Sequence, residues 1–192
     1  MLGRIKRLLK GEPDFTIHRG EGVYMRRWYV IPRNRFFNIY LHHFLQSDDP
    51  RALHDHPWWN VSIVLKGGYW EIVPVVTPRN TDLEAWARPS AKTFFSDVGR
   101  AHIASYFLRT RRVYRRPGTI KARGALDAHR VELLWDGIDS QGKPKERSCW
   151  SLFITGPNRR VWGFWLPDGW APFTDMVEMT PDGRGNKQKA LP

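Results

Sequence analysis

A chain of 192 residues is long enough to form one ordinary domain with its own hydrophobic core. Its hydrophobic content of 41%, with 10 Trp, 10 Phe and 6 Tyr, excludes an intrinsically disordered chain, and charged residues interrupt every apolar run before it reaches membrane-spanning length. The excess of 31 Lys and Arg over 19 Asp and Glu gives a formal charge of +12. This charge is compatible with nucleic acid, an anionic small molecule or an acidic partner as ligand, and equally with a surplus that only keeps a solvated surface soluble.

The first ten residues predict a short basic helix. Its aliphatic side chains recur at the spacing that places them on one helical face, which consists of Leu2, Ile5, Leu8 and Leu9. Gly11 and Pro13 end the helix. We expect this N-terminal arm, residues 1–21, to dock on its own domain or on a second subunit rather than on a membrane or a phosphate backbone.

The sequence between the arm and residue 175 predicts β-strands. Segments rich in Val, Ile, Tyr, Phe and Trp alternate with Gly and Pro, and they lack the longer periodicity of helices. Strands are expected at 24–31, 36–45, 60–66, 69–76, 103–108, 129–135, 150–155 and 161–166. Many short strands predict an all-β barrel or sandwich over residues 22–175, followed by a basic flexible tail at 176–192.

The cysteine content and the N-terminal sequence predict the cellular compartment of the protein. Cys149 is the only cysteine, so the chain can form no internal disulfide. The first residues lack the apolar segment and the small-residue cleavage site of a secretory signal. We therefore expect a cytoplasmic protein with no membrane partner.

His54 and His56 are the most informative of the seven histidines. Residues two apart in a strand point to the same face with their Cα atoms about 6.6–7 Å apart, so two imidazoles can converge on one ion. Asp55, between them, then points to the opposite face. A third ligand has to come from a strand that is distant in the sequence. The alternative is that these are core histidines, hydrogen-bonded to backbone or to one another without an ion.

Two motifs resemble the signatures of the cupin superfamily. The residues that carry the first signature are His54, His56, Asn60 and Gly67, and those that carry the second are Gly118 and His129. Asn60 stands where the family usually has a glutamate ligand, and Gly118 stands at the turn that precedes the last histidine ligand. The segment LHDHPWWNVSIVLKGGYWE is also similar to small cupin-like proteins of phage genomes.

The resemblance implies an all-β fold, the RmlC-like jelly roll or cupin double-stranded β-helix, with a short N-terminal helix. It also implies a divalent metal bound by His54, His56 and His129, similar to the three-histidine ferrous site of cysteine dioxygenase, where open positions take substrate and dioxygen. Fe(II) is the favoured ion, and Mn, Ni and Zn are the alternatives. Asn60 is a candidate for an extra metal ligand or pocket residue, and His102 is the rival third ligand.

Candidate substrate-binding residues lie close to the second signature. The segment RTRRVYRR contains Arg109, Arg111, Arg112, Arg115 and Arg116. Guanidinium groups bind carboxylate or phosphate in a bidentate manner, so Arg115 and Arg116 are candidates for holding an acidic small-molecule substrate, together with Tyr69. The alternative is a solvated edge strand whose charges oppose aggregation.

Three functions are consistent with these features. The first is an oxygenase-like metal enzyme acting on a small, anionic molecule. The second is a sugar-phosphate or sugar-nucleotide isomerase or epimerase, in which a pocket histidine removes a proton and Tyr69 or Tyr40 returns one. The third is a non-catalytic module that contacts nucleic acid or a protein partner. Nucleic acid is the less favoured partner because many aromatic residues fall in predicted strands, where alternation directs them inward. The resemblance also implies a homodimer.

Overall fold

The computed structural model describes residues 2–19, 22–50, 52–75, 109–140, 142, 144–166, 169–179 and 185–188. The strand predicted at 103–108 and the rival ligand His102 lie outside these residues. Each of the other predicted strands is present, and the fold is dominated by antiparallel β-structure. No helix within the described residues is long and apolar enough to span a membrane.

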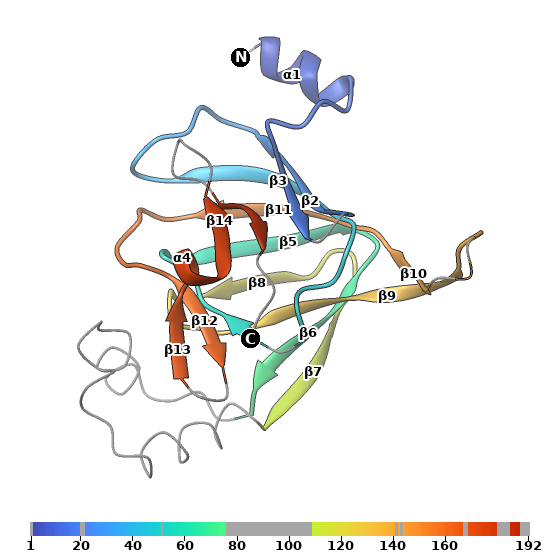
Figure 1. Ribbon diagram of the computed structural model, residues 1–192. Coiled ribbons are helices and arrows are strands. Elements are labelled where there is room, and N and C mark those ends of the chain that lie inside the picture. The colour runs from blue at the N-terminus through green and yellow to red at the C-terminus, as the bar shows by residue number, and fades with distance from the viewer. Residues whose placement is uncertain are drawn as a thin grey trace.

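The elements follow one another in an order that begins with the predicted helix. They are α1 (Leu2–Leu9), β1 (Phe15–Arg19), β2 (Gly22–Tyr29), β3 (Asn38–Phe44), β4 (Leu53–His54), β5 (Asn60–Lys66), β6 (Tyr69–Pro74), β7 (Thr110–Arg115), β8 (Ile120–Arg123), β9 (Arg130–Ile138), β10 (Pro144–Arg147), β11 (Cys149–Thr155), β12 (Gly163–Leu166), β13 (Gly169–Pro172), α4 (Phe173–Met176), β14 (Val177–Met179) and β15 (Gly185–Gln188). Figure 1 shows the strands wrapped around a common interior.

The strand order is that of a jelly roll. One sheet contains the run β3-β11-β5-β8, and the facing sheet contains β9-β6-β7, which β4 approaches through an antiparallel bridge between His54 and His129. If β3 to β9 and β11 are counted as first to eighth, the first sheet holds the first, eighth, third and sixth strands. The second holds the second, seventh, fourth and fifth. This interleaving defines a double-stranded β-helix, so the predicted fold class is confirmed.

Glycines of both signatures lie in the turns that the fold needs. Gly67 and Gly68 connect β5 to β6 with φ values of +89° and +121°, and Gly118 connects β7 to β8 with φ +86°. Only glycine adopts such φ values without strain, and paired positive φ values suit a two-residue hairpin. A Cβ on Gly67 would also lie 3.1 Å from the Cα of Cys149, so the turn packs closely on β11.

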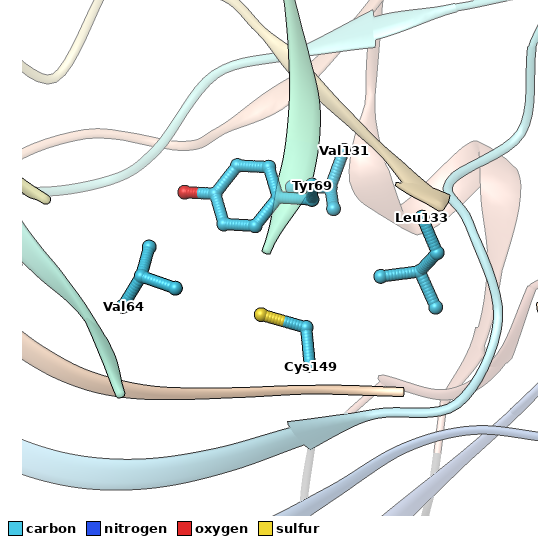
Figure 2. Packing of buried hydrophobic residues seen from close by; sticks show 5 residues of the cluster. All are labelled: Val64, Tyr69, Val131, Leu133 and Cys149. Carbon is cyan, nitrogen blue, oxygen red and sulfur yellow. The ribbon is translucent and has the colours of Figure 1, made fainter. Parts of the chain in front are cut away.

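The central core lies between the two sheets, beside the candidate site. Figure 2 shows the cluster, which consists of Val64, Tyr69, Val131, Leu133 and Cys149. These side chains come from β5, β6, β9 and β11, and each is 4% exposed or less. Burial of apolar surface from both sheets is the main force that holds the strands in register.

The sheet extends past both predicted limits of the 22–175 unit. Strand β1 pairs with β2, and β15 pairs with β1 in parallel while β14 pairs with β15. Part of the predicted flexible tail therefore forms strands, through backbone hydrogen bonds that need no apolar side chains. Helix α1 projects from the sheet (Figure 1), and Leu9 is 81% exposed, so this part of the predicted apolar face does not dock on the described residues.

Candidate metal centre

The structure brings the three predicted histidines together. The backbones of His54 and His129 are joined by two hydrogen bonds, 2.8 and 3.0 Å long, where β4 meets the start of β9. His56 follows two residues after His54, and its Nε2 lies 3.0 Å from Nε2 of His129. One potential ligand atom from each of the three side chains lies within 4.8 Å of the others.

Asp55 fixes the orientation of the histidines on either side of it. Its carboxylate is fully buried and accepts hydrogen bonds from the backbone N of Gly163 at 2.8 Å and from the indole nitrogens of Trp165 and Trp170 at 3.1 and 3.0 Å. Arg160 forms an ion pair with it at 2.9 Å. Because Asp55 is held on the side of β12 and β13, alternation directs its two neighbours to the opposite side, as the sequence predicted.

Glu71 supports His129 from behind. Its carboxylate is fully buried, and Oε1 lies 3.1 Å from Nδ1 of His129 and 2.7 Å from Nε of Arg123. The other oxygen accepts a hydrogen bond from Nε of Arg115 at 2.6 Å. A carboxylate beside Nδ1 of an imidazole fixes the ring and directs Nε2 towards a metal, as is common among histidine ligands.

Burial keeps two of the histidines neutral. It lowers the pKa of His129 to about 4, with a further contribution from Arg123 and an opposing one from Glu71. It also lowers the pKa of His56 well below the usual value, and the neighbouring His54 and His129 add to this effect. Neutral imidazoles have a free lone pair on one ring nitrogen, which is the form that binds a metal ion.

The donor set and its spacing fit a divalent transition metal. Two nitrogens bound to one ion at the usual distances and angles lie about 3.0–3.4 Å apart, which includes the separation between His56 and His129. Three imidazoles suit Fe, Zn, Ni or Cu, and they leave coordination positions open for other ligands. Asp48 contributes a carboxylate oxygen 3.7 Å from Nδ1 of His54, where it could orient the ring for metal binding.

A cavity of about 320 Å³ adjoins the three histidines. Its wall is mainly aromatic and aliphatic, and its polar groups include Arg27, Arg123, His42 and Tyr69. Burial raises the pKa of Tyr69, so the phenol keeps its proton at neutral pH. A mostly apolar cavity with a few polar groups is typical of a site for a small molecule.

Of Asn60, Tyr69, Arg115 and Arg116, which the sequence also predicted for the site, only one lines the cavity. Tyr69 lines the cavity. Asn60 is fully buried and lies behind the wall, where Oδ1 accepts a hydrogen bond from Nη1 of Arg123 at 3.4 Å. Arg115 pairs with Glu71 instead of facing the cavity, and Arg116 is exposed. Neither arginine is among the described residues that line the cavity.

Sequence reasoning missed several residues of the site. Glu71 occupies the same strand face as Tyr69 in an otherwise apolar segment, and this alternation was a signal that its carboxylate is buried. Arg27 and Arg123 carried no comparable signal. His42 lines the cavity, whereas His43 stacks on Trp150 with ring centroids 4.0 Å apart. Adjacent strand residues face opposite ways, so only one of these two histidines was expected at the site.

The strand order defines a double-stranded β-helix, and His54, His56 and His129 form a cluster that could hold a metal ion in it. No protein-family model matches the sequence, and no curated protein matches it.

Several solved structures are similar at low identity. The DMSP lyase DddQ from Ruegeria pomeroyi DSS-3 is 11% identical with a TM-score of 0.37, over 70% of this chain and 48% of the lyase, so the chain spans about half the length of that protein. The Fe(II) form of HppE in complex with substrate is 10% identical with a TM-score of 0.42, over 73% of this chain and 54% of HppE. A cupin domain from Bordetella pertussis Tohama I is 10% identical with a TM-score of 0.35, over 69% of this chain and 92% of the domain.

Proposed function

We propose that the protein is a mononuclear non-haem iron enzyme that oxidises a small organic molecule with dioxygen. His54, His56 and His129 would hold Fe(II), and the adjoining cavity would hold the substrate. The observation that carries the proposal is the convergence of three imidazoles, two of them kept neutral by burial, on the wall of a mainly apolar cavity.

The choice of metal follows from the charge of the ligands. Three neutral imidazoles leave the full double charge on a divalent ion, and no carboxylate belongs to the described ligand cluster. Such a centre attracts an anionic or electron-rich substrate. When bound, Fe(II) supplies the one-electron chemistry that reactions with dioxygen require. Mn, Ni and Zn are the other ions to test.

The surrounding residues determine how a substrate is held. Glu71 keeps the ring of His129 in one orientation, and Asp55 fixes the segment that carries the other two histidines. Tyr69 keeps its proton, so its hydroxyl can donate a hydrogen bond to an oxygen of the bound substrate. Phe153 and Phe164 are part of the wall that excludes water from the reacting atoms.

Metal analysis tests this proposal. We expect the full-length protein, loaded with Fe(II) under anaerobic conditions and then desalted, to retain about one iron per chain. The double variant His54→Ala/His56→Ala should retain almost none. His43→Ala is the matched control, because this histidine stacks on Trp150 away from the cavity and its loss should leave the metal content unchanged. Equal metal content in wild type and double variant would exclude this metal centre.

A second candidate function is the isomerase or epimerase reaction. It is favoured by Tyr40, His42 and Tyr69, which line the same cavity. Burial lowers the pKa of His42 well below the usual value, so its imidazole is neutral, and it could accept a substrate proton at Nε2 once the hydrogen bond from Nε of Arg27 is broken. Turnover of a sugar phosphate without oxygen, retained by the His54→Ala/His56→Ala variant, would favour this reaction over oxidation.

A further inference from the structure

Arg27 is a partly buried cation in the wall of the cavity. It lies on β2, and burial lowers the pKa of its guanidinium. Nε donates a hydrogen bond to Nε2 of His42 at 2.9 Å, and Cζ lies 5.0 Å from the centre of the Tyr40 ring. No carboxylate of the described residues lies within ion-pair distance of it, so its two Nη groups have no anionic partner there.

Three other buried or partly buried arginines differ from Arg27 in this respect. Arg115 and Arg123 share the carboxylate of Glu71, and Arg160 pairs with Asp55. A buried charge without a counter-ion is costly, and proteins usually supply a partner. Arg27 borders the cavity, so a ligand bound there can supply the missing negative charge.

Besides Arg27, the charged residues that line the cavity include Arg33 and two aspartates, Asp48 and Asp49. Arg33 lines the same cavity, with Cζ 5.7 Å from the centre of the Tyr29 ring. Asp48 also lines it, but its carboxylate accepts hydrogen bonds from the hydroxyl of Tyr24 and from the backbone N of Val131. Asp48 is therefore held by its own partners and does not pair with Arg27.

An aromatic wall connects the arginine to the histidine cluster. The ring of Phe153 stacks on His42 at 5.1 Å between centroids and lies 5.8 Å from the ring of His56. Because His42 bonds Arg27 and His56 belongs to the metal cluster, Phe153 lies between the two ends. A ligand that reaches from one end to the other therefore runs along an apolar surface.

We infer that Arg27, with Arg33, binds the carboxylate of an amphipathic organic acid whose apolar body lies against Phe153 and whose other end reaches the metal centre. This inference names the substrate class and rests on the proposed function for the identity of the site. Arg27 is a specificity-determining residue in this arrangement, because its guanidinium can form a charge-assisted pair with a carboxylate but not with a neutral group.

Calorimetric titration with two matched probes tests the inference. The probes are 3-phenylpropionate and its neutral amide, which have the same carbon skeleton. We expect wild-type protein to bind the acid at least tenfold more tightly than the amide. Arg27→Gln should abolish this preference and Arg27→Lys should retain part of it. Arg26→Gln is the matched control, since Arg26 is exposed beside Arg27 on the same strand and its loss should leave the preference unchanged.

The experiment distinguishes failure of the carboxylate subsite from failure of the proposed metal centre. A tenfold preference for the acid that persists in His54→Ala/His56→Ala supports the carboxylate subsite even if the protein binds no metal. Equal affinity for acid and amide in wild type contradicts the subsite, and so does failure of the acid to bind at millimolar concentration. Wild-type affinity for the acid in a folded Arg27→Gln variant also overturns it, whatever the metal content.

Discussion

Replacing Glu71 by glutamine perturbs the metal centre without touching a ligand. Glutamine keeps the size of the side chain and removes its negative charge. In the wild type this carboxylate neutralises two arginines, Arg115 and Arg123, whose side chains are 17% and 2% exposed, and it lies behind His129. Glu71→Gln therefore leaves a buried guanidinium without its counter-ion and loosens the support of a histidine ligand.

The expected loss of stability in Glu71→Gln follows from the burial of Arg123. Breaking a buried ion pair by removing one partner costs about 3–5 kcal/mol, mostly because the remaining charge is left unpaired. Since Arg123 is almost completely buried, we expect the free energy of unfolding without metal to fall by about this amount. Loss of support for a histidine ligand lowers metal affinity about 10- to 100-fold.

An exposed ion pair supplies the control. Glu132 on β9 pairs with Arg112 at 2.7 Å, and the two side chains are 34% and 55% exposed. The same chemical change there, Glu132→Gln, should cost less than about 1 kcal/mol because exposed pairs contribute little. It should leave metal affinity unchanged, because neither side chain contacts the histidines.

Urea denaturation in the presence of EDTA measures stability, and calorimetric titration with Zn or Fe(II) measures affinity. The reasoning is refuted if Glu71→Gln and Glu132→Gln unfold at the same urea concentration and bind metal equally well. If Glu71→Gln lowers stability but not metal affinity, the carboxylate stabilises the fold without positioning His129.

Two further predictions concern buried titratable groups. Burial lowers the pKa of His42, so this histidine is protonated in the unfolded chain at a pH where it is still neutral in the folded chain. The free energy of unfolding without metal should therefore fall as pH drops below about 6.5. His42→Gln should reduce this dependence between pH 6.5 and 5, and urea denaturation curves that match the wild type across this range would contradict it. Burial raises the pKa of the Cys149 thiol, which is fully buried, so a thiol reagent should label it only after unfolding. Rapid labelling of the native protein at pH 8 would show that β11 opens far more readily than its packing indicates.

The sequence predicted most of the central strands, β3, β5, β6, β9 and β11 among them, because they carry a local signal, but it did not predict the short β4 and β8. Asn60 to Lys66 alternates buried and less buried residues, and Gly67 follows at the turn. Strands β1 and β15 were missed because they are short and partly polar, and they join the sheet through backbone hydrogen bonds. A pairing that depends on the backbone leaves little trace in composition.

The convergence of the three histidines was predictable from the sequence, whereas the residues that support them were not. His54 and His56 share a strand face by spacing alone, and His129 stands at a family-like distance from a turn glycine. The partnership of Glu71 with His129 depends on how β6 pairs with β9, and that register is fixed only in the folded sheet. The position of Arg27 depends on register in the same way. Arg27 faces the cavity because it is the arginine that pairs with His42 across β2 and β3.

X-ray absorption on metal-loaded protein tests the central claim most directly. With Fe(II) or Co(II) bound, the spectrum of the wild type should show scattering from three imidazoles with metal–nitrogen distances of about 2.0–2.2 Å. His129→Ala should lose one imidazole contribution, while His43→Ala should match the wild type. A spectrum without imidazole scattering, or one that His129→Ala leaves unchanged, would show that these three histidines do not share an ion.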